Sequence, residues 1–283
     1  MNDKNERKQL EETEMFFPTV SCARNKMKIF DTHAHYDDEA FAEDRVVLLE
    51  SLPVQGIARV VNVGASLASC KTTLELMDGY DYIYGAIGVH PSETAELNEE
   101  NFKQLAEWCR HKKCVAVGEI GLDYYWDEPE REIQKKWFVR QLDLARQIQL
   151  PVVIHSRDAA KDTADIMIAE KAKEIGGVVH CYSYSKEMAR TFLDMGFYFG
   201  IGGVLTFKNA RVLKEAVEYI PMDRIVLETD CPYLAPEPNR GKRNSSLNLP
   251  YVVKAMAELK GISEEEVRRI TWENGLKLYR MER

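Results

Sequence analysis

Hydrophobic and polar positions follow one repeating pattern from Met27 onward. A short apolar run, rich in β-branched or aromatic residues, is followed each time by a longer amphipathic stretch. Runs that are apolar at nearly every position are typical of parallel strands that are buried on both faces. The pattern predicts eight strands, at 28–33, 58–63, 83–89, 114–118, 152–155, 177–180, 197–200 and 224–227.

The amphipathic stretches predict helices. The clearest one repeats its core-facing positions with a helical period, at Ile133, Trp137, Phe138, Gln141, Leu142, Ala145 and Ile148. A last helix is predicted from Ser263 to about Leu278, because Ser263 and Glu266 have the spacing of a capping box. Further helices are predicted at about 100–111, 158–175, 185–194, 209–219 and 248–260.

Strands that alternate with helices indicate an α/β fold, and eight of them predict a closed (β/α)8 TIM barrel. The competing fold is a doubly wound open sheet, which usually has fewer strands and a glycine-rich turn after the first one. Here the first predicted strand runs into Asp31-Thr32-His33-Ala34-His35, which contains no glycine. We therefore expect the barrel.

Residues 1–26 are polar and lack periodicity, which predicts a flexible N-terminal extension, or an upstream start codon with Met27 as the first residue, before a single domain at 27–283. No run approaches the ~20 apolar residues of a membrane span, and the N-terminus lacks the apolar segment of a secretory signal. The six cysteines are scattered without Cys-x-x-Cys spacing, which predicts free thiols in the cytoplasm. We expect neither a membrane nor an obligate protein partner.

Charge narrows the range of functions. The formal net charge of −8 at pH 7 argues against a protein that coats duplex nucleic acid through a broad basic surface. An enzyme that binds a few phosphates locally remains compatible with this charge.

Histidines and carboxylates gather at the predicted strand ends, where the active sites of (β/α)8 enzymes lie. His33 and His35 are two residues apart on a strand, so both imidazoles lie on one face and can converge on an ion. Six donors exceed one tetrahedral site and fit two divalent ions bridged by a carboxylate. Such donors suit Zn or Mn, and carboxylates with water also allow Mg. The six are His33, His35, Glu119, His155, His180 and Asp230.

One of these donors, Asp230, and two neighbouring residues, Asp31 and His90, are candidates for further roles. Asp230 is the candidate general base, since it can accept a proton from a water that bridges the ions. Asp31 is expected to orient a ligand instead of binding metal. His90 either contacts the substrate or has a structural role.

Basic residues on the same side are candidates for binding substrate. Arg157 either neutralises a phosphate or pairs with Asp158 or Glu228. Arg240, Lys242 and Arg243 form a short basic loop after the last strand, which is either solvated or in contact with an anionic ligand.

An ordered set of motifs resembles the TatD family of metal-dependent deoxyribonucleases, within the amidohydrolase-like superfamily, from Met27 to about Tyr279. Two stretches depart from the family pattern, Cys181-Tyr182-Ser183 after His180 and Ser245-Ser246 after the basic loop. The motifs are Phe30-Asp31-Thr32-His33-Ala34-His35, Gly88-Val89-His90-Pro91, Gly118-Glu119-Ile120-Gly121-Leu122-Asp123-Tyr124, Pro151-Val152-Val153-Ile154-His155-Ser156-Arg157-Asp158-Ala159, Gly200-Ile201-Gly202-Gly203 and Leu227-Glu228-Thr229-Asp230-Cys231-Pro232-Tyr233-Leu234-Ala235-Pro236, the last of which runs on into Arg240-Gly241-Lys242-Arg243-Asn244.

The resemblance implies a role for each candidate ligand. His33, His35, Glu119 and Asp230 would hold one ion, and Glu119 would bridge to a second ion bound by His155 and His180. Glu119 and Asp230 would then be the catalytic residues.

The resemblance also implies a deoxyribonuclease that cleaves phosphodiester bonds through a metal-bridging hydroxide. We expect 3′–5′ trimming of single-stranded DNA ends, with substrate contacts from Arg157, Arg240, Lys242 and Arg243. Two alternatives stay open. One is a small-molecule amidase, lactonase or deaminase with the same metal centre, and the other is a non-catalytic metal-binding barrel.

Overall fold

The structure is a computed structural model that describes residues 28–281. The extension predicted at 1–26 lies outside the described residues. Its flexibility, and the domain boundary predicted at 27, therefore stay predictions.

The described residues form one eight-stranded parallel sheet whose strands follow each other in chain order. The backbone N–H of His35 donates to the carbonyl of Cys231 at 2.8 Å, and that of Asp230 donates to the carbonyl of His33 at 3.0 Å. These bonds join the first strand to the segment after the last one, so the predicted (β/α)8 barrel is confirmed. The strands are β1 (Ile29–Ala34), β2 (Ile57–Val63), β3 (Ile83–Ile87), β4 (Cys114–Asp123), β5 (Val152–Arg157), β6 (Gly177–Val179), β7 (Tyr198–Ile201) and β8 (Ile225–Leu227).

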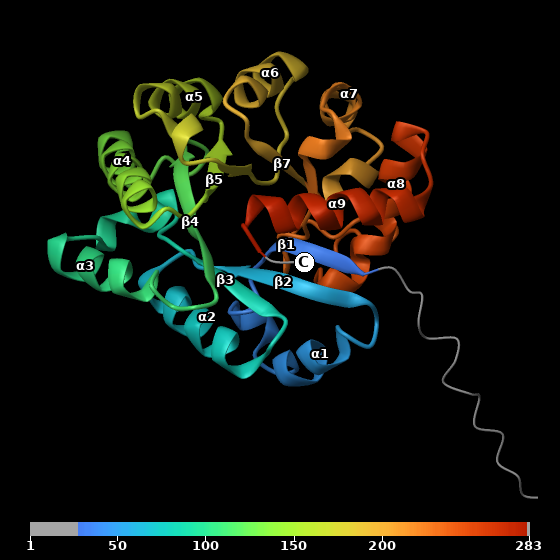
Figure 1. The fold of residues 1–283 in the computed structure, drawn as a ribbon, viewed down its shortest axis with the longest axis horizontal. Coiled ribbons are helices and arrows are strands. Elements are labelled where there is room, and N and C mark those ends of the chain that lie inside the picture. The colour runs from blue at the N-terminus through green and yellow to red at the C-terminus, as the bar shows by residue number, and fades with distance from the viewer. Residues whose placement is uncertain (1–27, 282–283) are drawn as a thin grey trace, which may run out of the picture.

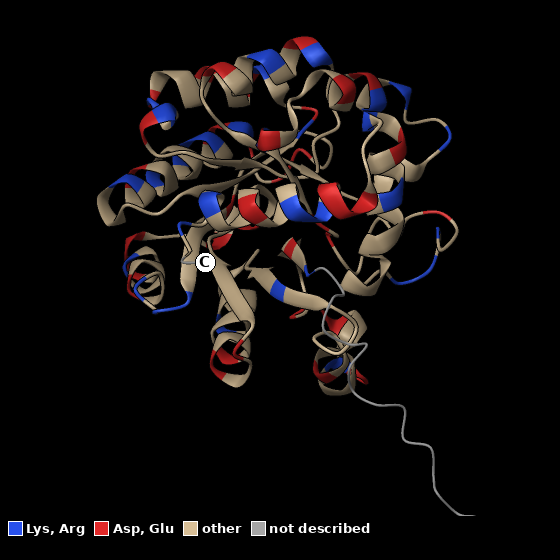
Figure 2. Ribbon diagram, turned by 45° about the vertical axis from the view of Figure 1, so that its right-hand side comes forward, with Lys and Arg blue, Asp and Glu red and all other residues tan. Residues whose placement is uncertain are grey.

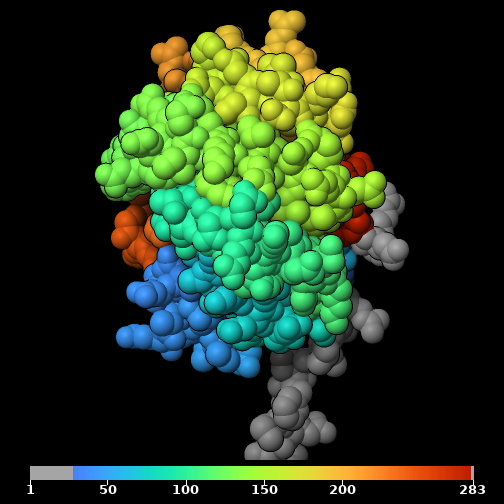
Figure 3. Space-filling view, turned by 90° about the vertical axis from the view of Figure 1, so that its left-hand side faces the viewer, coloured from blue at the N-terminus to red at the C-terminus, as the bar shows by residue number. Residues whose placement is uncertain are grey.

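Helices surround the strands in chain order (Figure 1). In the space-filling view the colours also change in chain order from α1 upward, so successive helices are neighbours on that face (Figure 3). In the part of the chain that the structure describes, the α-helices are α1 (Arg45–Ser51), α2 (Leu67–Gly79), α3 (Glu99–Trp108), α4 (Arg131–Ile148), α5 (Ala160–Ala169), α6 (Lys186–Asp194), α7 (Arg211–Tyr219), α8 (Leu249–Lys260) and α9 (Glu264–Leu278).

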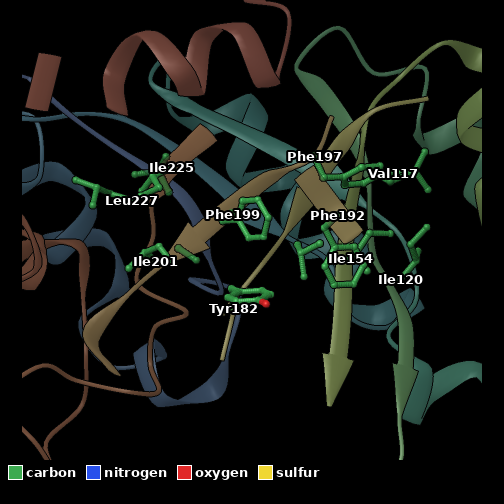
Figure 4. Packing of buried hydrophobic residues seen from close by; sticks show 14 of the residues in the cluster. Val117, Ile120, Ile154, Tyr182, Phe192, Phe197, Phe199, Ile201, Ile225 and Leu227 are labelled. Atoms are coloured by element: carbon green, nitrogen blue, oxygen red, sulfur yellow. The ribbon is translucent and has the colours of Figure 1, made fainter. Parts of the chain in front are cut away.

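The apolar core has two parts, because successive side chains of a strand point to opposite faces. Val60 packs in a cluster shared with the helices, while Val61 and Val63 belong to a second cluster. The first cluster includes Phe192 of α6, Phe197 before β7 and Phe199 within β7 (Figure 4). The second cluster fills the barrel interior with Phe30, Val61, Val63, Ala86, Ala116, Val153, Val178 and Val226.

The end of α9 closes the barrel at the N-terminal ends of the strands. Leu276, Leu278 and Tyr279 belong to the interior cluster, and the Tyr279 hydroxyl donates to the carbonyl of Thr32 at 2.7 Å. Gly275 permits this approach, since a Cβ there would lie 2.6 Å from a ring carbon of Phe30. The opposite, C-terminal end of the barrel is left for polar residues.

Two differences from the predicted elements matter for the site. Strand β4 continues to Asp123, so the predicted end at 118 is wrong, and Glu119 lies within the strand. Gly121 allows this continuation: its φ is +146°, and a Cβ would lie 1.9 Å from the carbonyl oxygen of His155 on β5. Helices α1 and α2 were not predicted, because α1 has only seven residues and the apolar periodicity of α2 is weak.

Acidic and basic residues are interspersed along the outer helices (Figure 2). In this view of residues 28–281, the basic residues do not gather into a continuous surface (Figure 2). Among residues 28–281, we find no helix whose length and apolar content would suit a membrane crossing.

Candidate metal centre

The first pair of histidines comes from the C-terminal end of β1. The Nε2 atoms of His33 and His35 lie 3.0 Å apart, and both rings are buried. His35 Nδ1 contacts the carbonyl oxygen of Val63 at 2.8 Å, and since a carbonyl only accepts, Nδ1 donates. The Nε2 of His35 therefore faces the site.

The second pair comes from β5 and from the residue after β6. His155 Nδ1 lies 3.2 Å from His180 Nε2. On its other side, His155 Nε2 contacts Asp123 Oδ2 at 3.0 Å. A carboxylate that holds one ring nitrogen fixes the orientation of the other, as in many metal-binding histidines.

The Glu119 carboxylate lies between the two pairs. Its Oε1 is 2.6 Å from both His155 Nδ1 and His180 Nε2. Its Oε2 is 3.4 Å from His33 Nε2 and 3.7 Å from His35 Nε2. Each oxygen of one carboxylate thus faces one pair of imidazoles, which is the arrangement needed to bridge two cations.

Asp230 follows β8 and completes the group on the side of the first pair. Its Oδ1 lies 3.3 Å from His35 Nε2 and 3.6 Å from His33 Nε2. The side chain is 17% exposed, against 4% for Glu119. Of the two carboxylates, Asp230 is therefore the one that water and substrate can reach.

The neighbouring histidines lower the pKa values of the two carboxylates, Glu119 and Asp230. Burial alone would raise the pKa of Glu119, but His180 and His155 hold that pKa well below its ordinary value. Burial likewise opposes ionisation of Asp230, yet the hydrogen bond with His35 and the nearby charges of His180 and His33 lower its pKa. Both carboxylates are therefore ionised at neutral pH, as metal ligands must be.

The pKa values of His33 and His35 are shifted in opposite directions. Burial, with His180 beside it, lowers the pKa of His33 to about 4. Burial opposes protonation of His35 too, but Asp230 and Glu119 raise its pKa to about 10. A proton and a divalent cation therefore compete for the Nε2 of His35.

The donor set fits divalent metal ions. Nitrogen and carboxylate oxygen atoms of His33, His35 and Asp230 lie within 4.8 Å of one another, and so do those of Glu119, His155 and His180. The buried Nδ1 of His33 also has no hydrogen-bond partner in the described residues. Imidazole nitrogens and carboxylate oxygens are donors that suit divalent metal ions, so these buried groups are able to bind metal.

Three residues without an assigned ligand role border this centre. Glu228 is buried, which raises its pKa to about 8, and its Oε1 lies 3.8 Å from His180 Nδ1. Asp123 contacts His155 as described above. His90 stacks edge-on against His155 with ring centroids 4.2 Å apart, and its Nε2 is 3.9 Å from Glu119 Oε1. The motifs around these residues were the only sequence signal, because nothing in the spacing assigns their contacts.

Asp31 supports the first histidine pair from behind. Its Oδ1 accepts from the backbone N–H of His33 at 3.3 Å, and its Oδ2 accepts from the hydroxyls of Thr229 and Ser246 at 2.7 and 2.6 Å. These contacts agree with the expected orienting role. They also give Ser246, one of the departures from the family pattern, a buried structural position.

The basic residues predicted to bind substrate differ in their surroundings. Arg157 is exposed and lies over the ring of Tyr125, 3.8 Å from its centroid, instead of pairing with Asp158 or Glu228. Arg240 and Lys242 are exposed, with Arg240 against Phe207. The residue that follows the loop is anchored next to Asp230, because Asn244 Nδ2 donates to the carbonyl of Thr229 at 3.0 Å.

Arg243 is engaged within the protein. Its guanidinium donates to both carboxylate oxygens of Asp44, at 2.8 and 2.5 Å, and to the carbonyl of Ala40 at 2.6 Å. It therefore offers fewer free donors to a substrate than Arg240 or Lys242.

Comparison with protein families agrees with this centre. The family model of TatD related DNases matches residues 30–280, which is most of the chain. The chain belongs to the TatD family. It is accordingly a metal-dependent hydrolase of the amidohydrolase-like superfamily, with buried histidine and carboxylate clusters able to bind metal.

Individual relatives cover nearly the same range. The chain is 43% identical to YabD of Bacillus subtilis, an uncharacterized metal-dependent hydrolase, over 89% of this chain and 99% of YabD. It is 34% identical to the uncharacterized metal-dependent hydrolase YcfH of Escherichia coli over 90% and 97% of the two chains. The crystal structure of the TatD homologue YjjV of Escherichia coli superposes with a TM-score of 0.85 at 28% identity, over 90% and 99% of the chains.

Proposed function

We propose that this TatD-family hydrolase is a deoxyribonuclease that trims single-stranded DNA from its 3′ end. The observation that carries the proposal is the Glu119 carboxylate, whose two oxygens each face one pair of histidines. The description of its family as TatD related DNases supports the choice of DNA. The proposal places the enzyme in the cytoplasm, as its scattered cysteines predict.

The proposed centre holds two divalent ions, Mg, Mn or Zn, with His33, His35 and Asp230 on one side of Glu119 and His155 and His180 on the other. Ions bound there would supply Lewis-acid stabilisation of the phosphoryl charge and a hydroxide nucleophile at neutral pH. Asp230 is assigned as the base because its Oδ1 faces the imidazoles while the side chain is open to the barrel mouth. The proton of the attacking water would pass to this carboxylate and then to the leaving oxygen.

The surroundings of the centre favour a strand end over a duplex. Arg157, Arg240 and Lys242 are exposed basic side chains at or after the C-terminal ends of β5 and β8, and the net charge of −8 repels a polyanion elsewhere. Few phosphates would be neutralised, so we expect a shallow dependence of affinity on salt.

A hydrolysis screen tests the proposal. With Mg, Mn or Zn, the enzyme is expected to release nucleotides from the 3′ end of a linear single-stranded DNA oligonucleotide, followed by gel electrophoresis of a 5′-labelled strand. Closed circular single strands serve as the control and should resist. Efficient cutting of circles would exclude end trimming, and turnover of amides or lactones with none of phosphodiesters would favour the small-molecule hydrolase.

The double variant Arg240→Ala/Lys242→Ala is expected to raise KM for the oligonucleotide several-fold more than KM for methyl 4-nitrophenyl phosphate. Removing a cation that neutralises one phosphate should reduce the slope of log affinity against log salt by about 0.7. Arg243 is left unchanged because its ion pair with Asp44 is structural.

The charge-matched control is Lys173→Ala/Lys277→Ala, whose side chains are exposed in the 3-10 turn before β6 and at the end of α9, toward the N-terminal ends of the strands. It removes the same charge away from the barrel mouth and should leave both KM values unchanged. An equal rise for both substrates in the Arg240/Lys242 variant would show that the loop is structural.

A further inference from the structure

Two large aromatic side chains next to the metal centre project into solvent. Tyr125 is 55% exposed and Trp126 is 64% exposed, in the segment between β4 and α4. Their rings are perpendicular, with centroids 5.1 Å apart. Neither belongs to the core clusters of the described residues. Neighbouring apolar rings that are exposed without a core role mark a binding surface.

The backbone of this pair is bonded to the metal centre. The N–H groups of Tyr125 and Trp126 donate to Asp123 Oδ1 at 2.9 and 3.2 Å. The other oxygen of Asp123 contacts His155 Nε2 at 3.0 Å. One carboxylate, that of Asp123, therefore joins the backbone of the aromatic pair to a candidate metal ligand, which fixes the segment that carries the rings next to the centre.

The positively charged side chain of Arg157 lies next to one of the two rings. The guanidinium of Arg157 lies over the Tyr125 ring, 3.8 Å from its centroid, and is exposed. One face of Tyr125 is therefore covered, while Trp126 keeps most of its surface open. Aromatic rings that stack bases, combined with cations that attract the backbone, are how proteins bind single-stranded nucleic acid without reading its sequence.

We propose that Tyr125, Trp126 and Arg157 form an aromatic platform on which an unpaired nucleobase next to the scissile phosphodiester stacks. Trp126 supplies the open face, and Tyr125 and Arg157 hold it in place. This inference rests on the proposed nuclease function and adds a reason for single-strand preference. A base inside a duplex has both faces covered by its neighbours, and a base at a duplex end is held by its pairing partner, whereas an unpaired base is free to turn onto the platform. Recognition through the face of the base is tolerant of sequence.

Binding of a labelled oligonucleotide to the metal-loaded enzyme tests the platform. The probe is a single-stranded DNA with phosphorothioate linkages at its 3′ end, which slow cleavage, and affinity is read by fluorescence anisotropy. Trp126→Ala is expected to raise Kd by about 5- to 150-fold, the range for loss of one base–aromatic stack. Trp126→Phe should keep most of the affinity, while Trp126→Leu should lose as much as alanine does.

An oligonucleotide that lacks the nucleobase gives a second test of the platform. An oligonucleotide with abasic nucleotides at its 3′ end should bind the wild-type enzyme more weakly by a similar factor, and Trp126→Ala should weaken it no further. The salt slope should be the same for wild type and Trp126→Ala, because an indole neutralises no phosphate. Tyr219→Ala, which removes a ring of 47% exposure at the end of α7, is the matched control and should change nothing.

The platform and the nuclease function fail in different ways. If wild type cleaves the oligonucleotide but Trp126→Ala binds it within two-fold of wild type, or if the abasic and Trp126→Ala effects simply multiply, the platform is overturned while the nuclease stands. If wild type binds the base-bearing strand through Trp126 but cleaves no phosphodiester, the platform stands and the nuclease falls. An enzyme that neither binds nor cleaves the strand overturns both.

Discussion

Replacing Asp230 by asparagine is expected to lower kcat by about 10²–10⁴-fold, the usual contribution of a general base. The amide oxygen can still face His35, as the Oδ1 of Asp230 does at 3.3 Å, so most metal affinity should remain. An amide cannot accept the proton of the attacking water. Steady-state kinetics at saturating metal, with metal content measured on the same sample, separate the two effects.

Asp158→Asn is the matched control for this variant. Asp158 also follows a strand at the C-terminal end of the barrel and has a similar positive φ, 54° against 55° for Asp230. It is exposed and belongs to none of the metal-binding groups found in the described residues. Asp158→Asn should keep wild-type turnover. Near wild-type turnover of Asp230→Asn would mean that another group or bulk water is the base.

Stripping divalent ions with a chelator is expected to abolish hydrolysis, and adding them back should restore it with about two ions per chain, as in two-metal hydrolase sites. Elemental analysis after dialysis measures the stoichiometry, with and without Mg or Mn returned to the buffer. Thermal unfolding gives a reading independent of activity, since ions that bind only the folded chain raise Tm.

The pH dependence of this binding has a defined sign. Because Asp230 and Glu119 raise the pKa of His35 to about 10, a proton must leave before an ion takes its Nε2. Metal binding is therefore expected to release protons, and metal affinity should rise with pH below that value. Calorimetry in buffers of different ionisation enthalpy measures the release.

Single substitutions are expected to distinguish the two proposed metal sites. His155→Ala should weaken one site and make turnover depend on metal concentration, whereas His111→Ala, which removes a histidine bonded to Asp78 outside the barrel mouth, should do neither. A stoichiometry near zero with and without added metal would exclude the proposed centre.

Much of the fold followed from the sequence because parallel strands leave a strong local signal. All eight predicted strands occur, and α4 spans the predicted periodic segment. The end of β4 was mispredicted because Gly118 and Gly121 look like strand breakers in the sequence. In the barrel, Gly121 instead allows β4 to approach the backbone of β5 closely.

The candidate ligands were also predictable, and for a topological reason. In a parallel barrel every C-terminal strand end lies at one rim, so residues far apart in the chain converge once the strands are assigned. The structure brings the six predicted residues together around Glu119, and it places His90, Asp123 and Glu228 in the same candidate groups. Which of these residues bind metal stays a prediction.

The sequence by itself thus determined the barrel and the kinds of donor at its mouth, because both depend on local patterns and on strand order. Tertiary structure alone decided the contact of Asp123 with His155, the engagement of Arg243 by Asp44 and the exposure of Trp126. Each of these depends on the direction of a side chain, and that direction is set by packing between segments that are distant in the chain, which no local pattern records.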